Sequence, residues 1–126
     1  MSLNHTLVDG TAHLGDTVNF TCRTRGSNTL AWRSQEYIGQ NGEELTISRL
    51  GTTSSLNSYA VATVTNTYIE NDQRVLESNL TIIVQGNIPN ASVTCSSIGT
   101  GESNMISFNL ASKCDGVILY TCNPGY

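Results

Sequence analysis

Apolar and polar side chains alternate along several short stretches of the chain. Between Thr17 and Cys22, the apolar side chains of Val18 and Phe20 alternate with polar ones. This period of two is typical of a strand with one buried face. The same alternation recurs in residues 30–34, 75–84, 93–97 and 106–110, and residues 44–47 and 59–69 are rich enough in β-forming side chains to be extended.

Turn-forming residues separate these stretches at intervals of about ten residues. Residues 70–73 are expected to join residues 59–69 and 75–84 into one long hairpin. No stretch has the period of a helix. The pattern therefore predicts an all-β protein, an antiparallel β-sandwich of roughly eight short strands. Its predicted core includes the side chains of Phe20, Leu80, Ile82 and Phe108.

Composition narrows the class of partner. The chain has 126 residues, a charged fraction of 13% and a net charge of −4. Because Lys113 is the single lysine and no basic cluster occurs, nucleic acid and anionic membrane surfaces are not expected partners. No run of 18 apolar residues is present, and the first residues lack the basic and apolar segments of a signal peptide. We expect the sequence to be an internal part of a larger ectodomain.

Cysteines and glycosylation sequons indicate an oxidising, extracellular compartment. The four cysteines are an even number, as expected if they form disulfides. Four Asn-x-Ser/Thr sequons predict a glycoprotein, with acceptors at Asn4, Asn19, Asn79 and Asn90. Cys114 and Cys122 are eight residues apart, and we expect a local bridge between them. The alternative is pairing with another segment or another chain.

Four pieces of the chain resemble an immunoglobulin-superfamily domain. They are residues 15–22, 30–32, 80–82 and 93–95, which resemble strands B, C, E and F of that family. The resemblance implies an immunoglobulin-like fold with a Cys22–Cys95 bridge between the sheets and Trp32 packed against that bridge. It runs from about Leu7 to Leu110, so residues 1–110 are expected to form one domain.

Two details refine this resemblance. Residues 32–42 are similar to the divergent immunoglobulin-like domains of invertebrate cell-surface receptors. The family usually carries a tyrosine two residues before the second cysteine, and Val93 stands there in this chain. We therefore expect the corner between strands E and F to be closed by other residues.

Residues 111–126 are expected to lie outside the domain. Their end, Tyr-Thr-Cys-Asn-Pro-Gly-Tyr at 120–126, resembles the middle of a sushi, or complement control, module. A full module needs more residues and four cysteines. The tail is thus either the start of a following module or a coincidental match.

The sequence offers no arrangement of residues for catalysis or for a metal. His5 and His13 are the two histidines, no zinc-ligand spacing occurs, and no Gly-x-Ser-x-Gly element is present. Residues 70–72 contain three oxygen-bearing side chains, but a plain hairpin turn explains them better than a weak calcium site. We expect a protein without enzymatic activity and without a cofactor.

The positions of the sequons predict which face of the sandwich is free. Asn19 and Asn79 are expected on the outer faces of strands B and E, which share a sheet in the immunoglobulin fold. No sequon is expected to point outward from the sheet of strands C, F and G. Its predicted partner-binding residues are Arg33, Gln35, Thr94, Ser96, Ser107 and Asn109.

The leading hypothesis is therefore a recognition or adhesion module of a cell-surface receptor that binds a protein partner, homophilic or heterophilic. One alternative is a structural spacer between neighbouring extracellular domains. Another is a secreted ligand-binding protein, for example one that binds carbohydrate, for which Tyr37, Tyr59 and Tyr68 are the candidate aromatic side chains.

Overall fold

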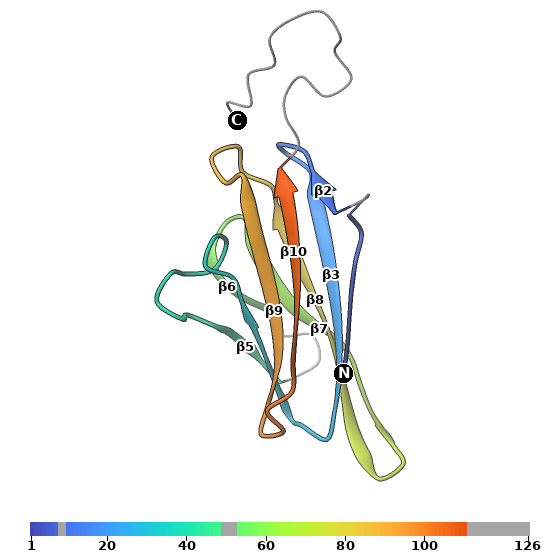
Figure 1. The fold of residues 1–126 in the computed structure, drawn as a ribbon. Helices are drawn as coiled ribbons and strands as arrows, with labels where there is room; N and C mark the ends of the chain where they lie inside the picture. The colour runs from blue at the N-terminus through green and yellow to red at the C-terminus, as the bar shows by residue number, and fades with distance from the viewer. Residues whose placement is uncertain (8–9, 49–52, 111–126) are drawn as a thin grey trace, which may run out of the picture.

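Two β-sheets make up the domain. The computed structural model describes residues 1–7, 10–48 and 53–110, with the side chains of residues 53–57 excepted. Within these ranges the chain forms ten β-strands in two five-stranded sheets and no helix (Figure 1). The cysteines predicted to pair locally, Cys114 and Cys122, and the rest of the tail lie outside the described residues.

The first sheet, sheet A, is antiparallel throughout. Its spatial order is β1 (Ser2–His5), β3 (Thr17–Arg25), β8 (Gln73–Ile83), β7 (Ala60–Glu70) and β6 (Thr53–Asn57). The alternation that predicted β3 is seen in its burial, because Val18, Phe20 and Cys22 face the interior. The long hairpin of β7 and β8 was likewise predicted, and it is closed by a two-residue turn between Glu70 and Gln73.

The second sheet, sheet B, faces the first. Its spatial order is β2 (Thr11–Ala12), β10 (Ser103–Leu110), β9 (Asn90–Ile98), β4 (Thr29–Arg33) and β5 (Leu45–Ile47). The short edge strand β2 runs parallel to β10, and the other neighbours are antiparallel. Figure 1 shows β9 and β10 in front of β7 and β8, with β3 to the right of β10.

A disulfide joins the two sheets at the centre of the core. Cys22 of β3 is bonded to Cys95 of β9. Trp32 lies directly opposite Cys95 in the register of β4 and β9, and it is fully buried. The side chains of Phe20, Leu80, Ile82 and Phe108 are buried in the same core. The fold is thus an immunoglobulin-like antiparallel β-sandwich with an inter-sheet disulfide, as the sequence predicted.

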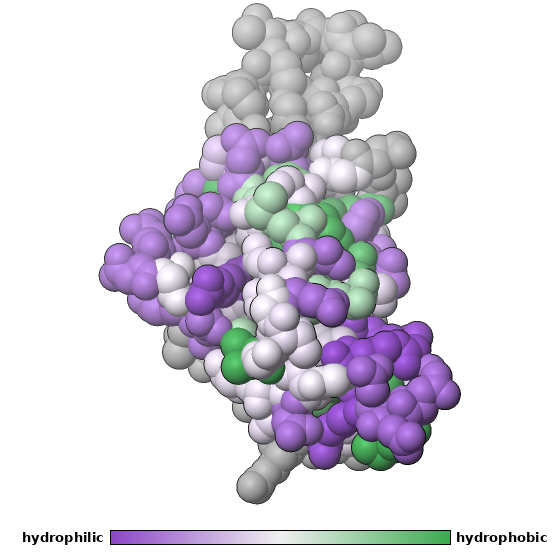
Figure 2. Space-filling view, turned by 60° about the horizontal axis from the view of Figure 1, so that its bottom comes forward, coloured by the Kyte–Doolittle hydropathy of each residue, from purple (hydrophilic) through white to green (hydrophobic). Residues whose placement is uncertain are grey.

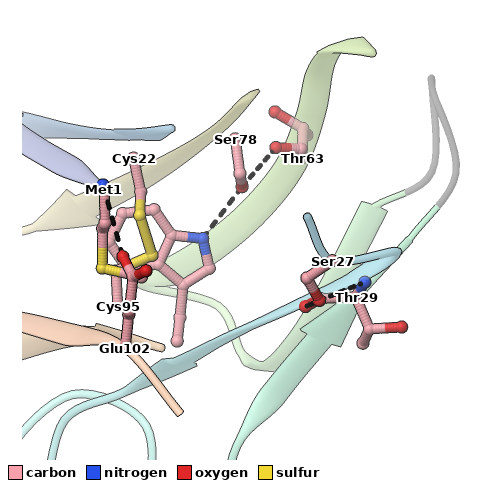
Figure 3. Close-up of a disulfide and its surroundings, with 9 residues drawn as sticks. Met1, Cys22, Ser27, Thr29, Thr63, Ser78, Cys95 and Glu102 are labelled. Atoms are coloured by element: carbon pink, nitrogen blue, oxygen red, sulfur yellow. Dashed lines mark hydrogen bonds and ion pairs between the residues drawn. A yellow bond between two sulfur atoms is a disulfide. The ribbon is translucent and has the colours of Figure 1, made fainter. Parts of the chain in front are cut away.

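Trp32 is also fixed by a short polar chain that crosses the core. Its indole Nε1–H donates to Ser78 Oγ at 2.9 Å, and Ser78 Oγ donates to the backbone carbonyl of Thr63 at 2.7 Å (Figure 3). The indole N–H and the serine hydroxyl are therefore satisfied although both residues are buried. This chain links sheet B to two strands of sheet A.

A tyrosine from a distant part of the chain closes the connection between β8 and β9. The Tyr37 hydroxyl accepts a hydrogen bond from the backbone N–H of Gln85 at 3.1 Å. Its ring stacks on Phe108 with 6.1 Å between ring centroids. Burial raises the pKa of the Tyr37 hydroxyl, and the hydrogen bond from Gln85 partly opposes that rise. Val93, at the position where the family usually has its tyrosine, is buried.

Candidate partner-binding face

The outer face of sheet B carries the residues that the sequence singled out for partner binding. Arg33 and Thr94 are cross-strand partners on β4 and β9, and Ser96 lies two residues further along β9. Ser107 and Asn109 face outward from β10 and are exposed. Gln35 is exposed too, but it follows the end of β4 and belongs to the connection of residues 34–44. The structure thus places all six on one side of the domain, with Gln35 beyond the sheet itself.

A turn after β4 sets the direction of the chain beyond Arg33. The Ser34 hydroxyl accepts from the Tyr37 N–H at 3.2 Å, and the Ser34 carbonyl accepts from the N–H groups of Ile38 and Gly39 at 2.9 Å each. This turn buries Tyr37 and leaves Gln35 exposed. Ser34 therefore fixes the backbone of the turn that contains both the core residue Tyr37 and the exposed Gln35.

Among the six predicted partner-binding residues, Arg33 is the one with a charged side chain. Its guanidinium forms an ion pair with Glu44, while the Arg33 side chain remains 53% exposed. An exposed ion pair of this kind contributes at most about 1 kcal/mol to folding. The guanidinium therefore remains available to a carboxylate or carbonyl of a partner.

Two exposed apolar side chains belong to the same face, and sequence reasoning missed both. Met105, 63% exposed, is the cross-strand partner of Thr94, and Ile98, 46% exposed, lies at the end of β9. The signal for Met105 was present, because the inward positions of Ile106 and Phe108 place it outward. Figure 2 shows a pale, weakly polar band with hydrophobic areas between two strongly hydrophilic regions.

The expectation that this face carries no sequon is wrong. In the sequence, Pro89 and the residues before it are typical of a loop, so the pattern does not place Asn90 on a strand. In the structure β9 begins at Asn90, which is exposed, and the next residue, Ala91, is buried. Asn90 therefore faces outward beside its cross-strand partner Asn109. It occupies one end of the face, and Arg33, Thr94 and Met105 lie further along the strands.

A polar depression borders this end of the face. It has a volume of about 640 Å³, and its lining includes Glu36, Tyr59, Asn87 and Asn90. The Glu36 carboxylate accepts a hydrogen bond from the Ser92 N–H at 2.9 Å, so it is anchored to β9. Of the three tyrosines considered for carbohydrate binding, Tyr37 is buried in the core. Tyr59 is the one that lines this depression.

The outer face of sheet A has a different character, because three sequons meet on it. Asn4 lies opposite Thr21, and Thr21 lies opposite Asn79, so these residues form one row across β1, β3 and β8. Asn19 and Thr81 form the adjacent row. Beyond them, two exposed ion pairs follow along the sheet: Arg23 with Glu77 and Arg25 with Glu70.

The rest of the described chain adds no other candidate site. No three His, Cys, Asp or Glu side chains of the described residues lie close enough together to hold a metal. In residues 1–7, 10–48 and 53–110, no helix has the length and apolar character needed to cross a membrane. No protein-family model, curated protein or solved structure matches the chain. The outer faces of the two sheets are therefore the candidate functional surfaces of the described chain.

Proposed function

We propose that this domain is a non-enzymatic recognition or adhesion module of a cell-surface receptor, and that it binds a protein partner through the outer face of sheet B. The observation that carries the proposal is the contrast between the two outer faces. Sheet A carries three sequons in adjacent rows, whereas sheet B carries one, Asn90 at its end, and leaves Arg33, Met105 and Ile98 exposed away from it.

The chemistry of sheet B suits a protein partner. Methionine and arginine are enriched in protein–protein interfaces, and arginine is among the residues that contribute most to binding energy. Here Met105 and Arg33 both neighbour Thr94 in one row across three strands. The row therefore provides an apolar contact and a hydrogen-bonding cation on the two sides of Thr94.

Glycans would strengthen the contrast. A sugar on any of the sheet A sequons would cover that face with bulky, hydrated mass. A sugar at Asn90 would cover one end of sheet B and leave the row of Arg33 open. The intrachain disulfide is typical of proteins that fold in an oxidising compartment, where such glycans are added.

A bead-aggregation assay with the secreted, glycosylated protein tests the proposal. We expect beads coated with the parent protein to clump, and beads coated with Arg33→Glu to remain dispersed. Arg23→Glu is the matched control, because Arg23 has a similar exposure of 47% and also pairs with a glutamate, but on sheet A. We expect this control to clump like the parent.

The remaining outcomes separate the alternatives. Equal loss of clumping in both variants would contradict a role specific to sheet B. If the parent does not clump, the same three proteins are used to stain intact cells, where a heterophilic partner predicts loss of staining for Arg33→Glu alone. No clumping and no staining by the parent would contradict the proposal and favour a structural spacer.

A further inference from the structure

Two sequons of sheet A face each other in a reciprocal arrangement. Asn19 lies opposite Thr81, and Thr21 lies opposite Asn79, because β3 and β8 are antiparallel. Each sequon thus places its asparagine beside the threonine of the other. From this geometry we propose that Asn19 is the glycan acceptor of the pair, and that Asn79 stays unmodified and holds the Asn19 side chain in position.

The hydrogen bonds distinguish the two amides. Asn79 Nδ2 donates to Asn19 Oδ1 at 3.3 Å and to Thr81 Oγ1 at 3.0 Å. Both hydrogens of this amide nitrogen are therefore in use. Asn19 Oδ1 accepts a further hydrogen bond from Thr81 Oγ1 at 2.9 Å. Asn19 is thus held through its oxygen, and no hydrogen bond within the described chain uses its Nδ2.

The chemistry of N-glycosylation gives this difference a consequence. The asparagine Nδ2 attacks C1 of a sugar that is linked to a lipid through a diphosphate. The C1–Nδ2 bond forms, the bond from C1 to the diphosphate oxygen breaks, the lipid diphosphate leaves, and Nδ2 releases one proton. A sugar on Asn79 would replace a hydrogen that binds Asn19 or Thr81 in the native sheet. A sugar on Asn19 leaves all three hydrogen bonds in place.

The order of synthesis favours the same acceptor. The two asparagines are 60 residues apart, and at about 5–20 residues per second the chain between them takes about 3–12 s to make. During that time Asn19 has no β8 to pair with. Asn79 follows its hairpin partner β7 directly, and a hairpin forms in about 1–10 μs. Asn79 is therefore exposed to the transferase as free chain for a shorter time.

Mapping of the occupied sites tests the inference, which rests on the proposed function only in requiring passage through the secretory pathway. The protein is secreted from eukaryotic cells behind a cleavable signal sequence. Its glycans are then removed enzymatically in ¹⁸O-water, so that each occupied asparagine becomes a labelled aspartate. We expect the label at Asn19 and none at Asn79. Label at Asn79 equal to or above that at Asn19, or no label at Asn19, would overturn the inference.

Variants test the same point by mass. Thr21→Ala should remove the mass of one glycan without a new label at Asn79, whereas the matched Thr21→Ser keeps the sequon and should keep the mass. Asn79→Gln should keep the label at Asn19 and the glycan mass, and a loss of mass with the label at Asn19 retained would overturn the inference. The binding assay with Arg33→Glu concerns the other sheet. Binding through Arg33 with a glycan on Asn79 would thus reject this inference alone, and the expected glycans without binding would reject the proposed function alone.

Discussion

Tyr37 joins two parts of the chain that lie far apart in sequence. Its ring packs in the core between Phe108 and Tyr59, and its hydroxyl holds the backbone of Gln85. This buried hydroxyl contributes through the hydrogen bond that it accepts from Gln85 and through its neutral state. Both contributions can be measured by removing one oxygen atom.

We expect Tyr37→Phe to lower the free energy of unfolding by about 0.5–1.5 kcal/mol at neutral pH, because the Gln85 N–H loses its acceptor while the ring packing stays. Urea denaturation measures the change. Tyr68→Phe, at a partly exposed residue, is the control and should unfold like the parent. Equal midpoints for Tyr37→Phe and the parent would contradict the role of this hydrogen bond.

The raised pKa of Tyr37 adds a dependence on pH. The folded protein holds the phenol proton more tightly than the unfolded chain, so this stability is fully present below the unfolded pKa of about 10. It is lost as the pH rises from there through the higher folded pKa. The parent should therefore lose stability above about pH 10 more steeply than Tyr37→Phe. Parallel losses in the two proteins would contradict the assignment.

Ser78 is the second residue whose polar atom matters inside the core. Ser78→Ala would leave the Trp32 Nε1–H buried without an acceptor, and we expect it to cost about 1–3 kcal/mol in the free energy of unfolding. Ser96→Ala also removes a serine hydroxyl, but from the outer face of sheet B. We expect it to change the free energy of unfolding by less than about 0.5 kcal/mol. Similar urea midpoints for the two variants would contradict the role of the Trp32–Ser78–Thr63 chain.

At this scale the sequence could assign residues to the core, but it could not assign their hydrogen bonds. Alternation places Phe20 and Leu80 inside because the period of a strand is local. Tyr37 follows no such period, since it lies in a turn, and its partner Gln85 is 48 residues away. A contact between segments so distant leaves no pattern in either segment.

The hairpin of β7 and β8 depends on two residues with left-handed backbone. Asn71 and Asp72 have φ values of 52° and 63°. A two-residue turn with positive φ at both positions matches the twist of the flanking strands. Glycine adopts this conformation without strain, whereas alanine has no polar side chain to offset the strain.

We therefore expect Asp72→Gly to be more stable than Asp72→Ala by about 1 kcal/mol in thermal or urea unfolding. Thr67, inside β7, is the matched control site. There the order should reverse, with Thr67→Ala more stable than Thr67→Gly by about 0.5–1 kcal/mol. The same order at both sites would contradict the assigned turn.

Many of the strands that the sequence predicted have an apolar face that repeats over several residues. Strands β3, β8, β9 and β10 each place a row of apolar side chains against the other sheet. The edge strands β1, β2 and β6 could not be given bounds from the sequence because they are short and add few apolar residues. The start of β9 was misplaced for a related reason: Pro89 and Asn90 are typical of a loop, although a proline is compatible with the residue just before a strand.

The disulfide is the one covalent link between side chains of the two sheets within the described residues, and its contribution belongs to the whole molecule. It closes a loop whose ends are 73 residues apart in sequence. The chain-entropy model gives about 4 kcal/mol for a loop of this length. We expect the double variant Cys22→Ala/Cys95→Ala to lose about that much of the free energy of unfolding. The parent under reducing conditions should lose a similar amount, and an unchanged urea midpoint in the double variant would contradict this estimate.

The sequence could predict the general position of the candidate site but not all of its residues. Outward positions on β4, β9 and β10 follow from alternation, so Arg33, Thr94 and Ser107 were found. Alternation places Met105 outward too, but it does not show that this methionine lies in the row of Arg33 and Thr94. The sequon at Asn90 was placed off the face because its strand boundary was wrong. The reciprocal arrangement of Asn19 and Asn79 needed the register of β3 and β8, which no local pattern reveals.

The position of Trp32 beside Cys95 has an optical consequence. A disulfide next to an indole accepts an electron from its excited state and so quenches its emission. Because Trp32 is the only tryptophan of the chain, the folded, oxidised domain should be dim in ultraviolet fluorescence. Unfolding would separate the indole from the sulfur atoms and brighten the sample. The intrinsic fluorescence of Trp32 therefore reports whether the core is intact, without any added label.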